Sequence, residues 1–432
     1  MPTVDQSKLV LNAFMANFQN NLVSADVASW KQRDGELNDR NRLTYSEQVG
    51  PRFTVQETVD GVADLTGGVQ DTVYGSEQFL VNRTFNSSMG WADFVKVRDI
   101  GDARESEAIK NAAMQLAERI DSYVMGVAGL ASNNWVQTNP AGNIADLGDV
   151  ASGYTRLKEE GVDDADLRAI LSYHDRQALS ETIVAYPATD SLATKNFRSG
   201  FEGTVNGIPT MFTQQLAVLR TGTRTAGAVN GATQNVNYKD VAISPAPGQY
   251  CTQLINIDGV GANATLKKGE VFTIAGVNAY DNRKQASLGR LQQFTVVEDA
   301  TASAGGAVTG LRIFPAIIVP GSGSGTDINV NTAHATVVAA PADNAVVTFV
   351  GTANTDYMPR FIIQKGAIRV NTVNLITPAT GESMSKSLTK VPLSVRMWKH
   401  SDFNTGAHSV RFDVALSANI VDRRRIVRIN AS

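Results

Sequence analysis

The stretch "ARESEAIKNAAMQLAERIDSYVMGVAGLA" at residues 103–131 carries the clearest structural pattern in this chain of 432 residues. Its apolar residues recur every three or four positions, which is the spacing of one face of an α-helix. Asp102 can cap the start of this helix, and the polar run "ASNN" marks its end. The predicted helix is more than twice as long as the average of about 11–12 residues, so we expect it to span a domain as a strut. Its apolar face consists of Ile109, Ala112, Ala113, Leu116, Ile120, Tyr123, Val124, Val127 and Leu130.

The residues that precede this helix, 43–85, show the shorter period of β-strands. Strands are expected in "RLTYSEQV", "PRFTVQETV" and "TVYGSEQFLVNRTF", and a Gly-rich tip, "DGVADLTGGVQD", separates the last two. The tip has few large apolar residues, so this excursion would bury little surface by itself and is expected to lie against a partner. Further upstream, residues 7–23 predict an amphipathic helix with Ser7 as its N-cap.

Downstream of the long helix, residues 149–219 predict a mixed α/β region, with helices near 149–161 and 174–185 and a buried strand at 167–173. At about Thr221 the composition becomes small and polar. The chain then offers only short β runs up to Val350, "HATVVAA" among them, with no helical stretch between them.

Regularly spaced short strands predict a small barrel or sandwich. This all-β module is expected to be inserted into the mixed α/β body, because the mixed pattern returns after Gly351. Residues 392–400 and 408–420 are predicted to form an antiparallel pair near the end of the chain.

The composition excludes several classes of protein. A hydrophobic share of 43% and a charged share of 19% indicate a globular chain. The net charge of −3 argues against a protein whose affinity depends on a strong positive field. A single cysteine, Cys251, cannot build a disulfide framework within one chain. No apolar run approaches 18 residues and the N-terminus lacks a secretory pattern, so no membrane span or signal peptide is expected.

Motifs that carry chemistry are weak throughout the chain. The four histidines show no metal-ligand spacing, and the "SMSK" match at 383–386 lacks the partner motifs of a β-lactamase-like enzyme. The acidic run "EEGVDDAD" at 159–166 lacks the ligand pattern of a calcium loop and is interpreted as a solvated helix end. The run "DRRRIVRI" at 422–429 either contacts phosphate or a neighbour's carboxylates, or forms a solvated strand face. We therefore expect no catalytic residue, no metal and no cofactor.

Three stretches resemble the major capsid proteins of tailed bacteriophages, which have the Hong Kong 97 fold. Residues 266–300, "LKKGEVFTIAGVNAYDNRKQASLGRLQQFTVVEDA", are similar to the telokin-like insertion domain of the short-tailed (podovirus) branch. Residues 349–368 resemble the return from that insertion into the core, and residues 392–420 resemble the C-terminal hairpin. Residues 221–265 depart most, because "SPAPGQY" is short where some relatives carry a longer protruding loop.

The resemblance implies an α+β capsid fold with a long spine helix, a β-sheet, an extended loop and an α/β axial domain, interrupted by an inserted all-β, barrel-like domain. The implied division is an N-terminal arm at 1–42, an extended β loop at 43–90, the spine-helix part of the peripheral domain at 91–134, the first part of the axial domain at 135–222, the inserted domain at 223–349, the second part of the axial domain at 350–391, and the C-terminal β hairpin of the peripheral domain at 392–432.

The resemblance also implies a function. Copies would assemble into hexamers and pentamers of an icosahedral head, with a scaffolding protein and with a portal protein at one vertex. The head would enclose double-stranded DNA without sequence-specific binding, and it would be assembled in the host cytoplasm and end in the virion. The residues expected to contact neighbouring subunits are Arg52, Phe53, Arg423, Arg424 and Arg425.

Three alternatives remain beside this interpretation. An encapsulin-like compartment shares the fold, but such shells usually lack the inserted domain. A tail or surface-layer component would not be expected to contain the long strut helix. A hydrolase with an accessory β module would need a nucleophile and a base that the sequence does not show.

Overall fold

The computed structural model describes residues 3–33, 44–55, 70–92, 101–136, 147–184, 204–205, 207–376, 378, 382–388, 391–401 and 407–429. The chain forms two compact units. Unit 1 contains Met1–Tyr45, Phe79–Val127 and Lys365–Val421, and unit 2 contains Ser46–Gln78, Ala128–Gln364 and Asp422–Ser432.

Unit 1 is built on a six-stranded sheet in which β23 is bonded to β20, β22 and β4, all antiparallel. The predicted antiparallel pair near the end of the chain is therefore confirmed as β22 and β23. The remaining strands, β1 and β21, lie at the two edges. The strands are β1 (Ser29–Gln32), β4 (Arg83–Ala92), β20 (Ile368–Val373), β21 (Glu382–Ser387), β22 (Ser394–Ser401) and β23 (Ala407–Ile420).

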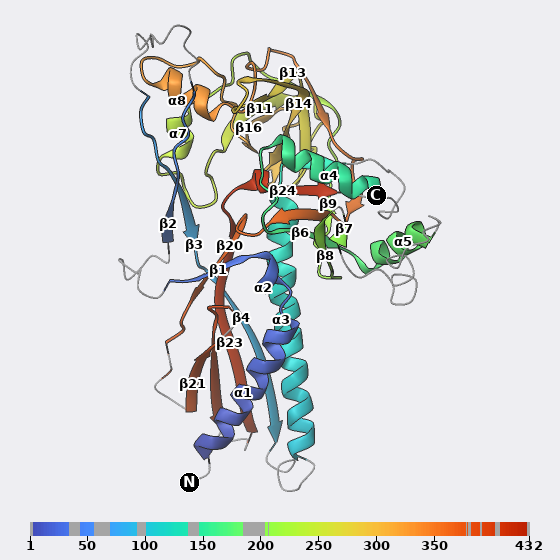
Figure 1. Ribbon diagram of the computed structural model, residues 1–432, viewed down its shortest axis with the longest axis vertical. Coiled ribbons are helices and arrows are strands. Elements are labelled where there is room, and N and C mark those ends of the chain that lie inside the picture. Colours follow the sequence, from blue (N-terminus) through green and yellow to red (C-terminus); the bar gives the residue numbers. More distant parts are fainter. Residues whose placement is uncertain are drawn as a thin grey trace. The chain divides into compact units, whose positions relative to one another are not determined.

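Two helices run along this sheet, α1 (Thr3–Asn21) and α3 (Gly101–Ala131) (Figure 1). Both confirm the helices predicted from apolar spacing, but the predicted N-caps are wrong, because Ser7 and Asp102 lie inside the helices. The ring of Phe14 on α1 stacks on Phe412 of β23, with the ring centroids 3.9 Å apart. A helix as long as α3 extends about 45 Å. Six residues of the predicted stripe are buried, Tyr123, Val127 and Leu130 are half-buried, and Ala117 and Met125 are buried in addition. The six are Ile109, Ala112, Ala113, Leu116, Ile120 and Val124.

A buried carboxylate ties the start of the chain to α3. Asp121 accepts hydrogen bonds from the backbone N–H groups of Val23 (2.8 Å) and Ser24 (2.9 Å), at the start of the short helix α2 (Ser24–Val27). Burial raises the pKa of Asp121 to about 6. A negative charge at a helix N-terminus is favourable, so this residue fixes the N-terminal arm on the long helix.

Unit 2 contains a second six-stranded sheet in the order β5, β24, β19, β6, β8, β7. The predicted elements of residues 149–185 are confirmed as α4, β6 and α5. The strand β24, from the end of the chain, lies between β5 and β19, and all four of its residues are buried. The elements are β5 (Asn134–Val136), α4 (Leu147–Glu159), β6 (Leu167–Leu171), α5 (Tyr173–Val184), β7 (Thr204–Val205), β8 (Ile208–Phe212), β19 (Arg360–Gln364) and β24 (Ile426–Ile429).

The predicted block 392–432 is thereby divided between the units. Its strands β22 and β23 belong to unit 1, whereas residues 422–432 belong to unit 2. The sequence shows no break at this point, because the strand patterns of the two parts follow each other directly.

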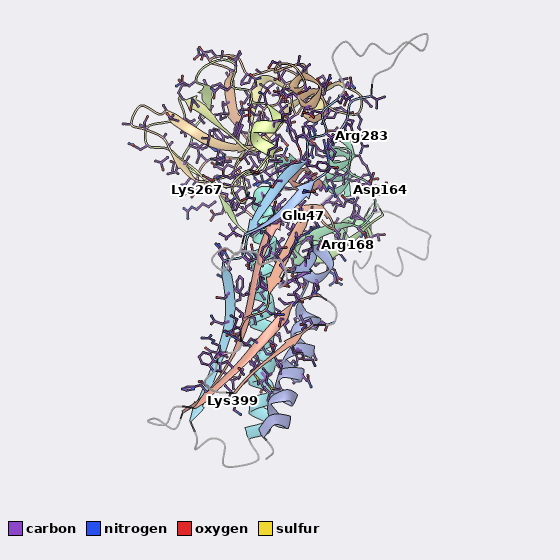
Figure 2. The ribbon with its side chains drawn as sticks, turned by 90° about the vertical axis from the view of Figure 1, so that its left-hand side faces the viewer. Glu47, Asp164, Arg168, Lys267, Arg283 and Lys399 are labelled. Carbon is purple, nitrogen blue, oxygen red and sulfur yellow. The ribbon has the colours of Figure 1, made fainter. Side chains whose placement is uncertain are left out.

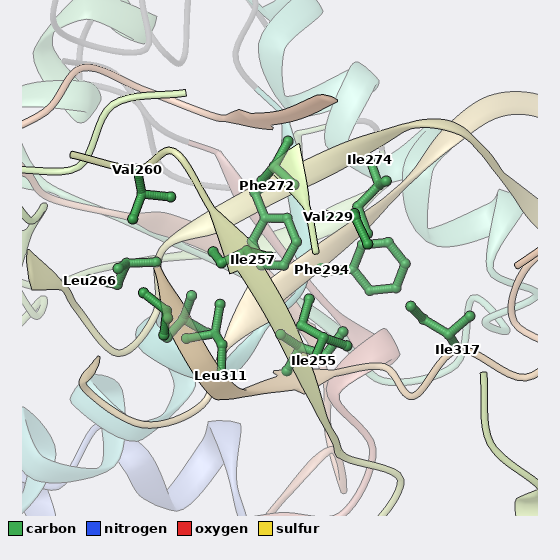
Figure 3. Close-up of a cluster of buried hydrophobic side chains, with 14 of the residues drawn as sticks. Val229, Ile255, Ile257, Val260, Leu266, Phe272, Ile274, Phe294, Leu311 and Ile317 are labelled. Carbon is green, nitrogen blue, oxygen red and sulfur yellow. The ribbon is translucent and has the colours of Figure 1, made fainter. Parts of the chain in front are cut away.

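Unit 2 also contains a closed barrel with the strand order β10, β11, β16, β14, β13, β17. Its interior is filled by aliphatic side chains around the rings of Phe272 and Phe294, whose centroids are 5.7 Å apart (Figure 3). The strands are β10 (Gly227–Val229), β11 (Gln253–Asp258), β13 (Val271–Asp281), β14 (Ala286–Val296), β16 (Val308–Phe314) and β17 (Val346–Phe349).

Three sequence predictions in unit 2 are wrong. The barrel region was expected to contain no helix, but it contains α7 (Tyr238–Ala242) and α8 (Asp327–His334). The run at 334–340 is not a strand, since His334 ends α8 and Val337 forms an isolated bridge with Ala279. Residues 51–55 of the predicted strand 51–59 are not in a strand, and its remainder lies outside the described residues. The strand predicted at 42–49 is present as β2 (Thr44–Val49). The strand predicted at 72–85 is divided between β3 (Gly75–Leu80), which pairs with β2, and the start of β4.

The two chain segments that lead into and out of the barrel are held by a buried ion pair. The Arg224 Nε atom lies 3.2 Å from Glu270 Oε1, and both side chains are almost completely enclosed. Glu270 also accepts the backbone N–H groups of Gly222 and Lys267, while Arg224 donates to the carbonyl groups of Val350 and Gly351. Below this pair, β9 (Leu219–Arg220) pairs with β18 (Asp356–Tyr357).

We predict that Glu270→Gln lowers the free energy of unfolding by about 3 kcal/mol, because it leaves the Arg224 charge buried without a counter-charge. The matched control is Asp299→Asn, which removes the exposed partner of Lys267 and should cost less than about 1 kcal/mol. Urea unfolding of the unassembled chain measures both values. Equal losses in the two variants would contradict a special role for the buried pair.

Candidate subunit-contact site

A cavity of about 520 Å³ in unit 2 brings together residues that the sequence placed far apart. Arg52 and Phe53 line it from the described start of the excursion, and Arg424 lines it from the C-terminal segment. The end of α4 and the turn between β13 and β14 supply Glu160 and Arg283. Three of the five predicted contact residues therefore share one cavity, whose wall carries charges of both signs.

Arg52 is positioned through its backbone. Its N–H group donates to Nε2 of His334 at 3.3 Å, and the imidazole stacks on the ring of Tyr238 with centroids 3.5 Å apart. The guanidinium side chain is exposed, and the positive charge of Arg424, followed by partial enclosure, lowers the pKa of Arg52 to about 10. Arg52 thus stays charged at neutral pH and faces another cation.

The three consecutive arginines belong to a turn of 3₁₀-helix, Arg423–Arg425, just before β24. Asp422 caps this turn: its Oδ1 atom accepts the backbone N–H of Arg424 at 3.1 Å and also the Arg424 Nε at 3.1 Å. Burial alone would raise the pKa of Asp422, but the charge and hydrogen bonds of Arg424 lower it to about 2. Arg425 lies 3.5 Å from the same carboxylate and is exposed, so it is the arginine of the three most accessible to a neighbour.

Arg423 has a different set of contacts. It donates to the carbonyl of Gly248 at 3.2 Å and lies 4.9 Å above the ring of Phe314. Burial also raises the pKa of Glu77 on β3 to about 8. The positive charge of Arg423 and hydrogen bonds from the N–H groups of Gly248 and Tyr250 act in the opposite direction and limit this rise. The guanidinium of Arg423 is therefore committed to contacts within its own subunit.

Sequence reasoning missed the buried groups that hold this site. His334 was not singled out because one histidine without metal-ligand spacing carries no signal. Glu77 resembled any polar residue of an alternating strand. For Arg428, away from the cavity, both interpretations given for the run 422–429 are wrong, because β24 is neither a solvated strand face nor a contact surface and Arg428 is fully buried.

The next question is whether the described residues include a reactive thiol or a metal site. Burial raises the pKa of the Cys251 thiol to about 12, so the nucleophilic thiolate is scarce at neutral pH. Among the described residues, no group of three or more His, Cys, Asp and Glu side chains is placed to hold a metal ion. No helix of the described chain is long and apolar enough to cross a membrane. The arrangement suits charge recognition at a surface.

The model of one protein family, described as "P22 coat protein - gene protein 5", matches residues 2–426 of this chain. This match spans almost the whole chain, including both units and the barrel. The chain belongs to the P22 coat protein family. It is a major capsid protein, which forms an icosahedral phage shell.

Solved structures of this class are similar to the chain. The mature capsid of bacteriophage PhiM1 matches with a TM-score of 0.45 and 9% identity, over 95% of this chain and 87% of that chain. The capsid of Ralstonia phage GP4 matches with a TM-score of 0.44 and 7% identity, over 96% and 90%. The CUS-3 coat protein I-domain is 25% identical over 30% of this chain and 96% of its own, with a TM-score of 0.21. None of the curated proteins matches the chain.

We predict that His334 makes the coat protein sensitive to acid. Burial lowers the pKa of His334 to about 3. Below about pH 6.5 the imidazole is therefore protonated in the unfolded chain but stays neutral in the folded chain. Above pH 6.5 His334 therefore does not reduce the free energy of unfolding. Between pH 6.5 and pH 4 this histidine alone should lower the free energy of unfolding by about 3 kcal/mol.

Urea unfolding of the unassembled chain at a series of pH values tests this. The variant His334→Gln should lose stability less steeply on acidification than the unaltered chain, and His174→Gln, which changes an exposed histidine on α5, should leave the slope unchanged. If His334→Gln retains the full slope, the histidine is protonated in the folded state and the assignment is wrong.

Proposed function

We propose that this coat protein forms the hexamers and pentamers of a short-tailed phage head, in the podovirus branch, and that residues 223–349 are an inserted telokin-like domain on a Hong Kong 97-type subunit. The observation that supports this most is the closed barrel between β10 and β17 inside a family match that continues on both sides of it. The paired strands β9 and β18 bring the two connecting segments together below the barrel, which is what an insertion into another domain requires.

The proposed partners follow from the same assignment. A scaffolding protein would guide assembly in the host cytoplasm, a portal protein would occupy one vertex, and the finished virion would enclose double-stranded DNA. The net charge of −3 supports confinement of DNA by the closed wall without base-specific contacts, since a strong positive field is absent.

The described ends of the excursion have the character of a contact surface. Phe53 and Val55 are 55% and 84% exposed, and Tyr74 on the returning segment is 54% exposed. Exposed apolar side chains that gather on one segment usually mark an interaction site. In a shell, many such contacts act together, so each can be weak enough to be corrected during assembly.

The test is electron microscopy and sedimentation of the chain produced alone and together with its scaffolding protein. Closed shells or rings of uniform size support the proposal. A folded chain that never assembles under either condition would return weight to the tail-component interpretation, and shells that load a protein cargo would favour the encapsulin-like compartment.

We predict that Arg52→Glu impairs assembly without destabilising the subunit. The substitution replaces the positive charge that repels Arg424 with a negative charge that attracts it. The free energy of unfolding should therefore stay equal or rise slightly. The yield of shells should fall by about tenfold, because a weakened contact is repeated throughout the shell. The control Arg52→Lys keeps the charge and should assemble. A loss of stability in Arg52→Glu would instead assign Arg52 to the core of its own subunit.

We also predict that residues 223–349 fold as an isolated fragment. The barrel core is contributed by residues from Val229 to Val347, and the Arg224–Glu270 pair is retained within the fragment. Hydrogen exchange should show protected amides in the barrel strands of the fragment. A fragment without protected amides would show that the barrel depends on the remainder of unit 2 and is not an autonomous domain.

A further inference from the structure

An acidic turn follows α4 in unit 2. The helix ends at Glu159, and Gly161 in the turn that follows has a φ of 77°, the left-handed conformation that favours glycine. The N–H of Gly161 donates to the Lys158 carbonyl, and the N–H of Val162 donates to the Leu157 carbonyl. This is the hydrogen-bond pattern of a Schellman cap. The chain then presents three exposed aspartates, Asp163, Asp164 and Asp166, which we call the acidic turn.

Two of these carboxylates are free to bind a partner. Asp164 is satisfied within the subunit by Lys158 and the hydroxyl group of Tyr154. Asp163 and Asp166 have no ion-pair partner among the described residues. The turn itself is held in place, since the side chain of Gln364 donates to the Ala165 carbonyl at 3.2 Å.

A basic tip lies beside the acidic turn. The turn between β13 and β14 exposes Arg283 and Lys284, and the Asp281 carboxylate fixes it by accepting the N–H of Arg283 at 2.8 Å. The guanidinium of Arg283 donates to the Gly161 carbonyl and packs on Gly161 so closely that a Cβ there would lie 2.8 Å from Arg283 Cζ. Neither Arg283 nor Lys284 has a carboxylate partner within the described part of the chain.

The two patches are therefore neighbours on one surface of unit 2. Gly161 bonds to Arg283 and stands only two residues before Asp163, and Figure 2 shows Arg283 and Asp164 on the same side. A surface that carries positive and negative patches side by side is complementary to a second copy of itself turned by a two-fold rotation. In such an isologous contact, residue i of one copy meets residue j of the other, and the reverse pair also forms.

We propose that two copies of this coat protein meet through this surface across a two-fold axis, with the acidic turn of each copy on the basic tip of the other. The proposal rests on the proposed assembly into capsomers, because closed icosahedral shells contain two-fold axes between them. The contact would add two sets of reciprocal ion pairs, presented by two turns whose backbones are already held in the free subunit.

Charge complementarity favours a second copy over nucleic acid as the occupant. A phosphate backbone approaching Arg283 and Lys284 would also meet the aspartates of the acidic turn. The adjacent cation Arg290 cannot help to bind phosphate, because it is paired with Glu159 at 2.8 Å and Glu160 at 2.9 Å.

Charge exchange tests the proposal on the full-length chain. The acidic-turn variant carries Asp163→Lys and Asp166→Lys, the basic-tip variant carries Arg283→Glu and Lys284→Glu, and a third chain carries all four changes. At low salt each of the first two should reduce the yield of shells in sedimentation by about tenfold, and the third should recover it, because reversed charges attract again. Mixing the first two chains should also restore assembly.

Two controls keep the result interpretable. Exchange of the exposed Lys267–Asp299 pair elsewhere in unit 2 should leave assembly unchanged, and urea unfolding should show that every variant is folded. The proposal is overturned if either reversed set assembles normally, if the fourfold variant fails to recover, or if the basic-tip variant assembles but loses only its DNA. If the unaltered chain forms no shells, it is the proposed function that fails.

Discussion

One buried cation holds unit 2 together. The guanidinium of Arg428 in β24 donates to the Gly269 carbonyl at 2.6 Å and to the Ser132 carbonyl, and it lies 5.2 Å above the ring of Trp135. Burial lowers its pKa to about 9, so it remains protonated near neutral pH. Because its partners come from the residue that follows α3 and from the turn before β13, the sheet and the barrel share one anchor whose loss would leave two carbonyl groups without this donor.

Unit 2 contains two kinds of charged side chain, those satisfied within the subunit and those exposed at its surface. The buried charges of Arg224 and Glu270 and the half-buried carboxylate of Asp422 are satisfied within the subunit and fix the backbone. Exposed charges at Arg52 and Arg425 remain available at the surface. A coat protein needs this separation, because rigid subunits can be joined by contacts that are individually weak, and a misplaced copy can then leave the growing shell.

The sequence predicts the elements whose patterns repeat, and it fails where tertiary contacts decide. The stripe of α3 and the alternation of β22 and β23 are long enough to be recognised from period alone. The helix α8 was missed because it is short and is fixed by Asn331, which accepts the N–H of Tyr238. Arg52 could be selected as an exposed charge, but its contact with His334 spans 282 positions in the chain, so only the fold brings the two together.

The place of β24 in its sheet has a consequence for synthesis of the protein. Residues 426–429 pair with both β5 and β19, so β5 and the edge of β19 that faces β24 stay unpaired on the ribosome until residue 429 has been translated, although β19 can already pair with β6. Domains fold as they emerge, yet this sheet cannot close early. An incomplete chain therefore cannot present a finished unit 2 to a growing shell, and folding itself verifies that translation has passed this strand.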